Sequence, residues 1–296
     1  MDSRFADFLV RAECVLTRLE PLLPAVREPL DWTHTLAARW QREGRSGYLQ
    51  GLEVSLDMHL ADLIGVDTQR EQLARNTWQF VQGMPANHAL LWGARGTGKS
   101  SLVRALLAEH ANAGLRLIEI ERDHLADLPR VVEQLMSLPQ RFILFCDDLS
   151  FEAGEGDYRV LKSVLDGSLE RSPENVLLYA TSNRRHLVPE RESDNANTKM
   201  VDGELHPNEA VEDKIALSDR FGLWLSFYPF TQQHYLDVVR HWIEVQAAQS
   251  GLEWQWSEEL EKLAVRWATG RGNRNGRCAY QFARQWVGLQ LLENSQ

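Results

Sequence analysis

The chain has 296 residues, 44% hydrophobic and 25% charged, so it can form one large or two ordinary globular domains and is not disordered throughout. Its net charge of −10 argues against a protein that coats nucleic acid, although a local basic patch is compatible with it. The three scattered cysteines, the lack of a signal-peptide pattern and the lack of a long apolar run predict a cytoplasmic protein without disulfides, a cysteine metal site or a membrane span.

Residues 1–60 are predicted to form a helical N-terminal region. Apolar residues recur at spacings of three and four over 5–19, which is typical of a helix with one apolar face, and Pro21 ends it. We interpret residues 32–40 as a second amphipathic helix. The region carries no chemical motif, so we expect a small bundle or a partner-binding appendage.

From residue 63 onward, short apolar runs alternate with helical stretches. This alternation predicts a five-stranded parallel sheet covered by helices on both faces, a three-layer α/β architecture. The predicted strands are 89–92, 115–120, 142–146, 176–181 and 223–227, and helices between them cover 99–111, 128–138 and 158–169.

Residues 93–100 carry the pattern G-x-x-x-x-G-K-S between a predicted strand and a predicted helix. This setting is typical of a phosphate loop, in which glycines let backbone N–H groups surround a phosphate chain. Lys99 supplies a charge for the β- and γ-phosphates and Ser100 a hydroxyl for Mg²⁺. The alternative is a glycine turn that binds nothing. The residues expected at the nucleotide are Gly93, Ala94, Arg95, Gly96, Thr97, Gly98, Lys99, Ser100 and Ser101.

The predicted strand 142–146 ends in two acids, Asp147 and Asp148. A phosphate loop needs a carboxylate at the end of a neighbouring strand to orient Mg²⁺, and we assign this role to Asp147. Asp148 would face the γ-phosphate and polarise the attacking water. The alternative is a pair of acids that opens a turn or caps a helix.

With these motifs the chain resembles the AAA+ ATPases over residues 60–292. The resemblance implies that Ile64 and Gly65 lie on the adenine side of the nucleotide. It also implies that Asn183 is sensor 1, a polar contact to the γ-phosphate or the lytic water. Arg220 is similar to the arginine finger, and Arg277 to sensor 2.

Three stretches resemble, more narrowly, a bacterial AAA+ family known only as a domain of unknown function. They are Asn76-Thr77 with Phe80, residues 91–101 and residues 145–152. This likeness sharpens the expected fold and names no substrate.

One residue departs from the AAA+ pattern, because most members carry Asp-Glu where this chain has Asp147-Asp148. Aspartate is one methylene shorter, so its carboxylate lies about 1.5 Å further back. We expect Asp148 to activate water in an adjusted site, with Glu152 as the second candidate and slow turnover as the third possibility.

Arg220 would stabilise charge on the transferring phosphoryl group. In AAA+ rings this arginine comes from the neighbouring subunit, so the resemblance implies an ATP-dependent homo-oligomer. The alternatives are a surface arginine paired with a nearby aspartate, or a finger at Arg184 or Arg185.

Residues 230–296 are predicted to form a helical lid, with helices near 231–249, 257–269 and 277–292. Arg271, Arg274, Arg277 and Arg284 allow three interpretations: a sensor 2 arginine with polar neighbours, a nucleic-acid strip or a solvated helix face. The acidic segment 189–213 is expected to be a long surface loop.

Together these features predict an ATPase that uses ATP/ADP and Mg²⁺, with a nucleotide-binding domain over 61–229. It would hydrolyse ATP between subunits and remodel an unidentified protein partner; nucleic acid is possible but not favoured, and no membrane is involved. The alternatives are an ATP-gated scaffold with slow hydrolysis and a DNA-associated loader. A small-molecule kinase fits least, because no substrate-binding insert is evident.

Overall fold

The computed structural model describes residues 3–19, 28–44, 46–151, 157–166, 173–184, 199–201, 204–206 and 217–294. In chain order the helices are α1 (Ser3–Leu19), η2 (Leu60–Asp62), α2 (Asp67–Val81), α3 (Lys99–His110), η3 (Ala111–Ala113), η4 (Arg122–Asp127), α4 (Leu128–Leu135), α5 (Asp157–Asp166), α8 (Gln232–Ser250), α9 (Glu258–Gly270) and α10 (Gly276–Asn294). The strands are β1 (Ala37–Glu43), β2 (Ser46–Leu52), β3 (Ala89–Gly93), β4 (Leu115–Glu119), β5 (Arg141–Cys146), β6 (Val176–Ser182), β7 (Lys199–Val201), β8 (Glu204–His206) and β9 (Leu223–Phe227).

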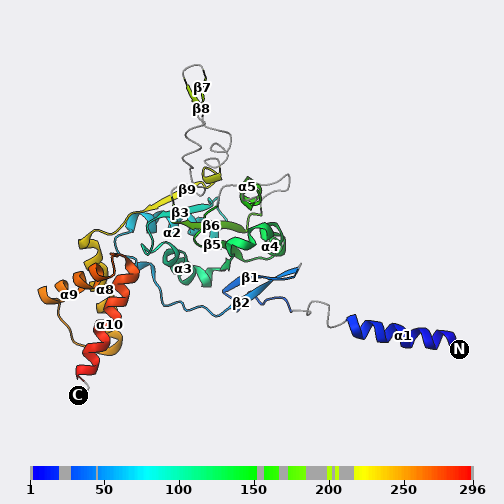
Figure 1. Ribbon diagram of the computed structural model, residues 1–296, viewed down its shortest axis with the longest axis horizontal. Coiled ribbons are helices and arrows are strands. Elements are labelled where there is room, and N and C mark those ends of the chain that lie inside the picture. The colour runs from blue at the N-terminus through cyan, green and yellow to red at the C-terminus, as the bar shows by residue number, and fades with distance from the viewer. Residues whose placement is uncertain are drawn as a thin grey trace.

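The main sheet has seven strands in the order β2-β1-β4-β5-β6-β3-β9 (Figure 1). The strands from β1 to β9 in this order pair in parallel, and β2 pairs antiparallel with β1 at the edge. The carboxyl ends of the parallel strands therefore share one edge of the sheet, which is where ligands bind in open α/β folds.

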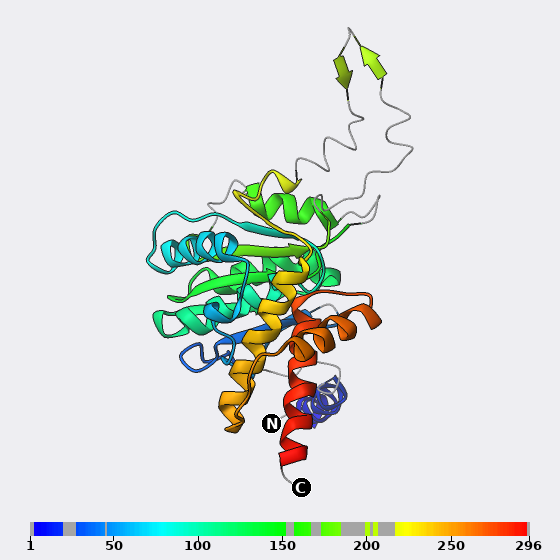
Figure 2. The same cartoon turned by 90° about the vertical axis from the view of Figure 1, so that its left-hand side faces the viewer.

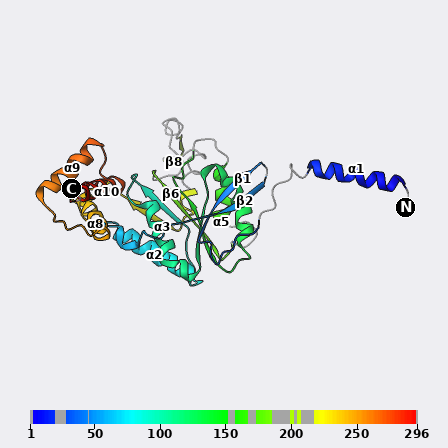
Figure 3. The same cartoon turned by 90° about the horizontal axis from the view of Figure 1, so that it is seen from below.

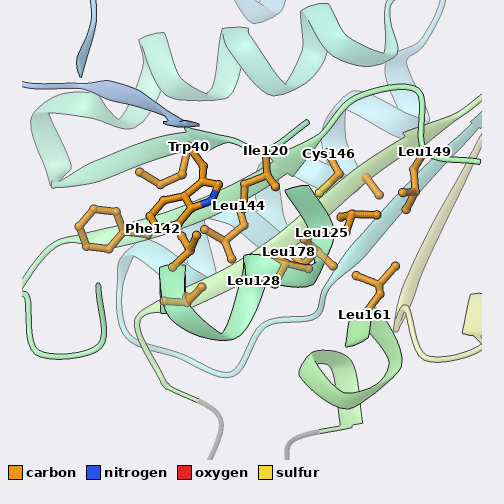
Figure 4. Packing of buried hydrophobic residues seen from close by; sticks show 14 of the residues in the cluster. Trp40, Ile120, Leu125, Leu128, Phe142, Leu144, Cys146, Leu149, Leu161 and Leu178 are labelled. Carbon is orange, nitrogen blue, oxygen red and sulfur yellow. The ribbon is translucent and has the colours of Figure 1, made fainter. Parts of the chain in front are cut away.

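Side chains that alternate along each strand build two separate cores, one on each face of the sheet. On β5, Phe142 and Leu144 belong to the core formed with η4, α4 and α5, and Figure 4 shows them in the same cluster as Leu128 and Leu161. The intervening Ile143 and its neighbours on the opposite face pack with α2 and α3. Burial on both faces explains why these strands read as continuous apolar runs.

The structure confirms the parallel α/β architecture and all five predicted strands, but the sheet has seven strands where five were predicted. The helix predicted over 32–40 is wrong, because Ala37–Glu43 is strand β1 and forms a hairpin with β2. Ala38 and Trp40 point into the core in period two, and the missing side chain of Gly47 leaves room for the Trp40 indole. A short apolar run without a clear period cannot distinguish a helix from a strand, so pairing with β4 decides here.

The C-terminal helices α8, α9 and α10 form a third core of their own, with α8 beside α10 (Figure 2). Thr231 and Ser257 cap α8 and α9 through their hydroxyls. This separate core supports a division of the chain near residue 230, which remains a prediction.

The helix predicted over 5–19 is present as α1, which lies apart from the sheet and the lid in Figures 1 and 3. Within the acidic segment 189–213, expected to be a loop, β7 and β8 pair as a short antiparallel hairpin. The rest of that segment lies outside the described residues. Among the described helices, none is long and apolar enough to cross a membrane.

Candidate nucleotide-binding site

The phosphate loop, residues 93–100, joins the end of β3 to the start of α3 at the carboxyl edge of the sheet. Gly93 has φ 132°, and a Cβ there would lie 2.0 Å from the carbonyl oxygen of Phe227 in β9, so only glycine fits. Thr97 is buried and donates to the carbonyl oxygen of Ala94 at 2.8 Å, which folds the loop on itself. Ser101 lies in the first turn of α3.

Lys99 is only 7% exposed and lies across the mouth of this loop. Its Nζ donates to the carbonyl oxygens of Gly93 at 2.9 Å and Ala94 at 2.7 Å. Burial lowers the pKa of Lys99, and the carboxylates of Asp147 and Asp148 oppose this shift. An ammonium group held by neutral carbonyls at a helix N-terminus is a strong attractor for an anion.

Asp147 follows β5 directly and meets the phosphate loop. Ser100 Oγ donates to Asp147 Oδ1 at 2.6 Å, and Thr181 Oγ1 at the end of β6 donates to the same oxygen at 2.6 Å. A hydroxyl beside a carboxylate is a hard oxygen donor set that fits Mg²⁺. In the described part of the chain no three His, Cys, Asp or Glu side chains gather as a metal site, so such an ion would need water or phosphate oxygens as further ligands.

Asp148 adopts a left-handed backbone conformation with φ 52°, the one described non-glycine residue with positive φ. Aspartate tolerates this region better than longer side chains, which gives a local reason for Asp where most AAA+ proteins carry Glu. Its N–H donates to Thr181 Oγ1 at 2.9 Å. Its carboxylate accepts from Asn183 Nδ2 and lies 3.7 Å from the guanidinium of Arg95.

Asn183 also accepts from Lys99 Nζ at 3.4 Å, so the predicted sensor touches both the loop lysine and the second acid. Glu152, the alternative water-activating residue, lies outside the described residues, as does Arg185. Arg184 is exposed just after β6.

The lid reaches the loop through the start of α10. Gly276 N donates to the carbonyl oxygen of Gly96 at 2.8 Å, and Asn275 Nδ2 donates to that of Arg95 at 3.4 Å. Arg277 is the next residue and is exposed, so the predicted sensor 2 lies beside the loop of its own chain.

A second lid contact involves Ile64 and Gly65, the residues expected on the adenine side. His234 Nε2 on α8 bonds to the carbonyl oxygen of Ile64 at 2.8 Å, and the imidazole stacks on Phe230 at 3.7 Å. Gly65 has φ 75°, and a Cβ there would lie 2.1 Å from this ring. His234 could not be predicted as a contact residue from the sequence, because a single histidine in an amphipathic helix gives no local signal.

The family model described as "Protein of unknown function (DUF815)" matches residues 33–290. The chain belongs to this family. The DUF815 match includes the β1–β2 hairpin, the sheet and the lid, and leaves α1 outside it. A search of curated proteins found no match.

Two solved structures resemble the DUF815 chain. A RuvB mutant of Thermotoga maritima has a TM-score of 0.53 at 14% identity, over 80% of this chain and 67% of that one. Orc1 of Aeropyrum pernix in complex with DNA has a TM-score of 0.52 at 17% identity, over 79% of this chain and 65% of that one. At such identities the likeness establishes the fold, which is that of the AAA+ ATPases.

Proposed function

We propose that this chain binds Mg²⁺–ATP at the phosphate loop, hydrolyses it at a subunit interface and thereby drives the remodelling of an unidentified macromolecule. The observation that carries the proposal is the 2.6 Å hydrogen bond from Ser100 to Asp147 beside the buried Lys99. The start of α3 and the end of β5, which are far apart in the sequence, thus meet, and this supports an anion-binding loop with an oxygen donor pair beside it.

Each residue has a role in this proposal. Lys99 and the loop amides hold the phosphates, and Ser100 and Asp147 would hold Mg²⁺, which neutralises charge on the phosphates. Asp148 accepts a proton from the attacking water, while Asn183 orients that water or the γ-phosphate. Arg277 approaches the phosphates from the lid.

Strand register supports a role for Arg220 in a neighbouring subunit. Gly93, where the phosphate loop begins, pairs with Phe227 at the end of β9, whereas Arg220 precedes the start of β9. The length of this five-residue strand, about 13 Å along the chain, separates the two. Arg220 is therefore poorly placed for its own nucleotide and can serve an adjacent one.

A mixing experiment tests this arrangement. Arg220→Ala and Asp148→Asn chains should each hydrolyse ATP slowly, yet their mixture should regain turnover, because the intact Asp148 of one chain then meets the intact Arg220 of the other. Mass measurement with and without ATP and Mg²⁺ should show larger assemblies with nucleotide. If the mixture stays inactive and the chain stays monomeric, the interface proposal fails. Lys99→Ala should remove nucleotide binding; retained affinity would refute the site itself.

The second candidate is an ATP-gated scaffold with slow hydrolysis. It is favoured by the contacts of the Asp148 carboxylate, since Asn183 binds one of its oxygens and Arg95 lies beside the other. A carboxylate held in this way is less available to activate water. Steady-state phosphate release separates the two candidates, since a remodelling motor turns over repeatedly and responds to its partner.

Association with DNA is a third, less favoured candidate, suggested by the DNA in the Orc1 structure. The arginine strip of the lid supports it little, because Arg271 stacks on Trp267 at 3.8 Å and donates to Gln281 at 2.7 Å. Salt-dependent binding of oligonucleotides would favour it, and no binding at low salt would exclude it.

A further inference from the structure

Arg95 occupies the third position of the phosphate loop, and its side chain faces the second acid across the site. Its Nη2 lies 3.7 Å from Asp148 Oδ2, with 80% of the Arg95 side chain and 59% of the Asp148 side chain exposed. The backbone at this point is fixed, since Asn275 donates to the carbonyl oxygen of Arg95 and Gly276 to that of Gly96. The guanidinium can therefore change position while the backbone of Arg95 stays in place.

The charges around Arg95 belong to one small cluster. Burial lowers the pKa of Lys99, the two neighbouring carboxylates oppose that shift, and the positive charge of Arg95 adds to it. Arg95 is therefore close enough to the loop lysine to share its electrostatic environment. Two cations and two carboxylates face each other here, and a triphosphate would compete with the carboxylates for both cations.

The Arg95–Asp148 ion pair is weak and readily exchanged. Both side chains are largely in water, where such pairs contribute little to stability. A phosphoryl group offers a guanidinium two parallel charge-assisted hydrogen bonds, which are stronger.

We propose that Arg95 is a γ-phosphate ligand supplied by the same subunit, which pairs with Asp148 when no γ-phosphate is present and leaves it when ATP binds. Asp148 is then free to accept a proton from water only when the nucleotide that can be hydrolysed is bound. This inference rests on the proposed function, and it adds a residue that distinguishes ATP from ADP.

Equilibrium binding of a non-hydrolysable ATP analogue and of ADP, each with Mg²⁺, tests this assignment on the full chain. Arg95→Ala should weaken binding of the analogue about 10- to 100-fold, the range for a charged hydrogen bond, and leave ADP affinity essentially unchanged. Arg95→Lys, which keeps the charge and loses the bidentate geometry, should lie between. Arg104→Ala, an exposed arginine on α3, is the matched control and should bind both nucleotides as the wild type does.

A double-mutant cycle gives the second measurement. Asp148→Asn should tighten analogue binding more in the wild-type background than in Arg95→Ala, because only the former has an arginine to release. The assignment would be overturned if Arg95→Ala lost affinity for the ATP analogue and for ADP equally, or lost none. In that case the proposed function would still stand as long as nucleotide binding is lost in Lys99→Ala. A wild-type chain that binds neither nucleotide would overturn both.

Discussion

The amide of Gly276 donates a 2.8 Å hydrogen bond to the carbonyl oxygen of Gly96, so the last helix begins on the phosphate loop itself. The fit is close on both sides: a Cβ on Gly276 would lie 3.1 Å from that oxygen, and a Cβ on Gly96 would lie 2.7 Å from the Asn275 amide group. A displacement of the phosphate loop would therefore also displace the start of α10. The lid is thus in direct contact with the candidate nucleotide site.

Asn275 should stabilise both α10 and the loop, and two substitutions separate these roles. Its Oδ1 accepts from Cys278 N at 2.9 Å, an N-cap, and Asn275→Ala should lower the free energy of unfolding by about 1 kcal/mol. Asn275→Ser can still cap the helix and should recover most of that loss in urea denaturation. Both variants lack the contact to Arg95 and should weaken nucleotide binding alike. Equal instability of the two variants would contradict the capping role.

Gly65→Ala should destabilise the protein through the backbone and through a clash. An L-residue at φ 75° costs about 1–2 kcal/mol, and the new methyl group would overlap the His234 ring. In Gly65→Ala/His234→Ala the clash is gone, so the double variant should lose less stability than the sum of the single changes. Chemical denaturation of all four proteins measures this difference, and strictly additive losses would show that the ring does not confine Gly65.

Asp148→Asn should bind ATP at least as tightly as the wild type and lower hydrolysis by at least about 100-fold, the range for loss of a general base. Phosphate release measures turnover and equilibrium binding measures affinity. Asp148→Glu is the matched control: it keeps the carboxylate, but its longer side chain suits φ 52° less well, so partial activity is expected. Unchanged turnover in Asp148→Asn would remove Asp148 from the mechanism and direct attention to Glu152.

His88 should make stability fall in mild acid. Burial lowers the pKa of His88 from 6.5 to about 4, and its Nδ1 accepts from Leu178 N at 2.9 Å, which requires the neutral ring. The unfolded chain takes up this proton near pH 6.5 and the folded chain only near pH 4. The contribution is thus complete above pH 6.5 and is lost as the pH falls toward 4, by at most about 3 kcal/mol.

Urea denaturation between pH 4 and 7 measures this loss, with His88→Asn as the control. Asparagine can accept the Leu178 hydrogen bond through Oδ1 and does not titrate, so its stability should depend less on pH in this window. The same slope in both proteins would assign the acid sensitivity to other groups.

Much of the site could be predicted from the sequence because its signals are local. The five predicted strands, β3, β4, β5, β6 and β9, are largely apolar stretches of five to seven residues, and the phosphate loop is a contiguous pattern between a strand and a helix. The start of β1 was wrongly predicted as part of a helix over 32–40 for the opposite reason. The buried positions of β1, such as Ala38 and Trp40, are explained only by the pairing of β1 with β4, about 80 residues away.

The sequence by itself determined that a glycine-rich loop with Lys99 and Ser100 would start a helix after a buried strand, because backbone conformation and periodicity are set by neighbouring residues. Only the tertiary structure decided which distant groups meet there. His234 reaches Ile64 across 170 residues, and Asn275 reaches Arg95 across 180. These contacts depend on strand order and on how the lid packs, and no local pattern encodes them.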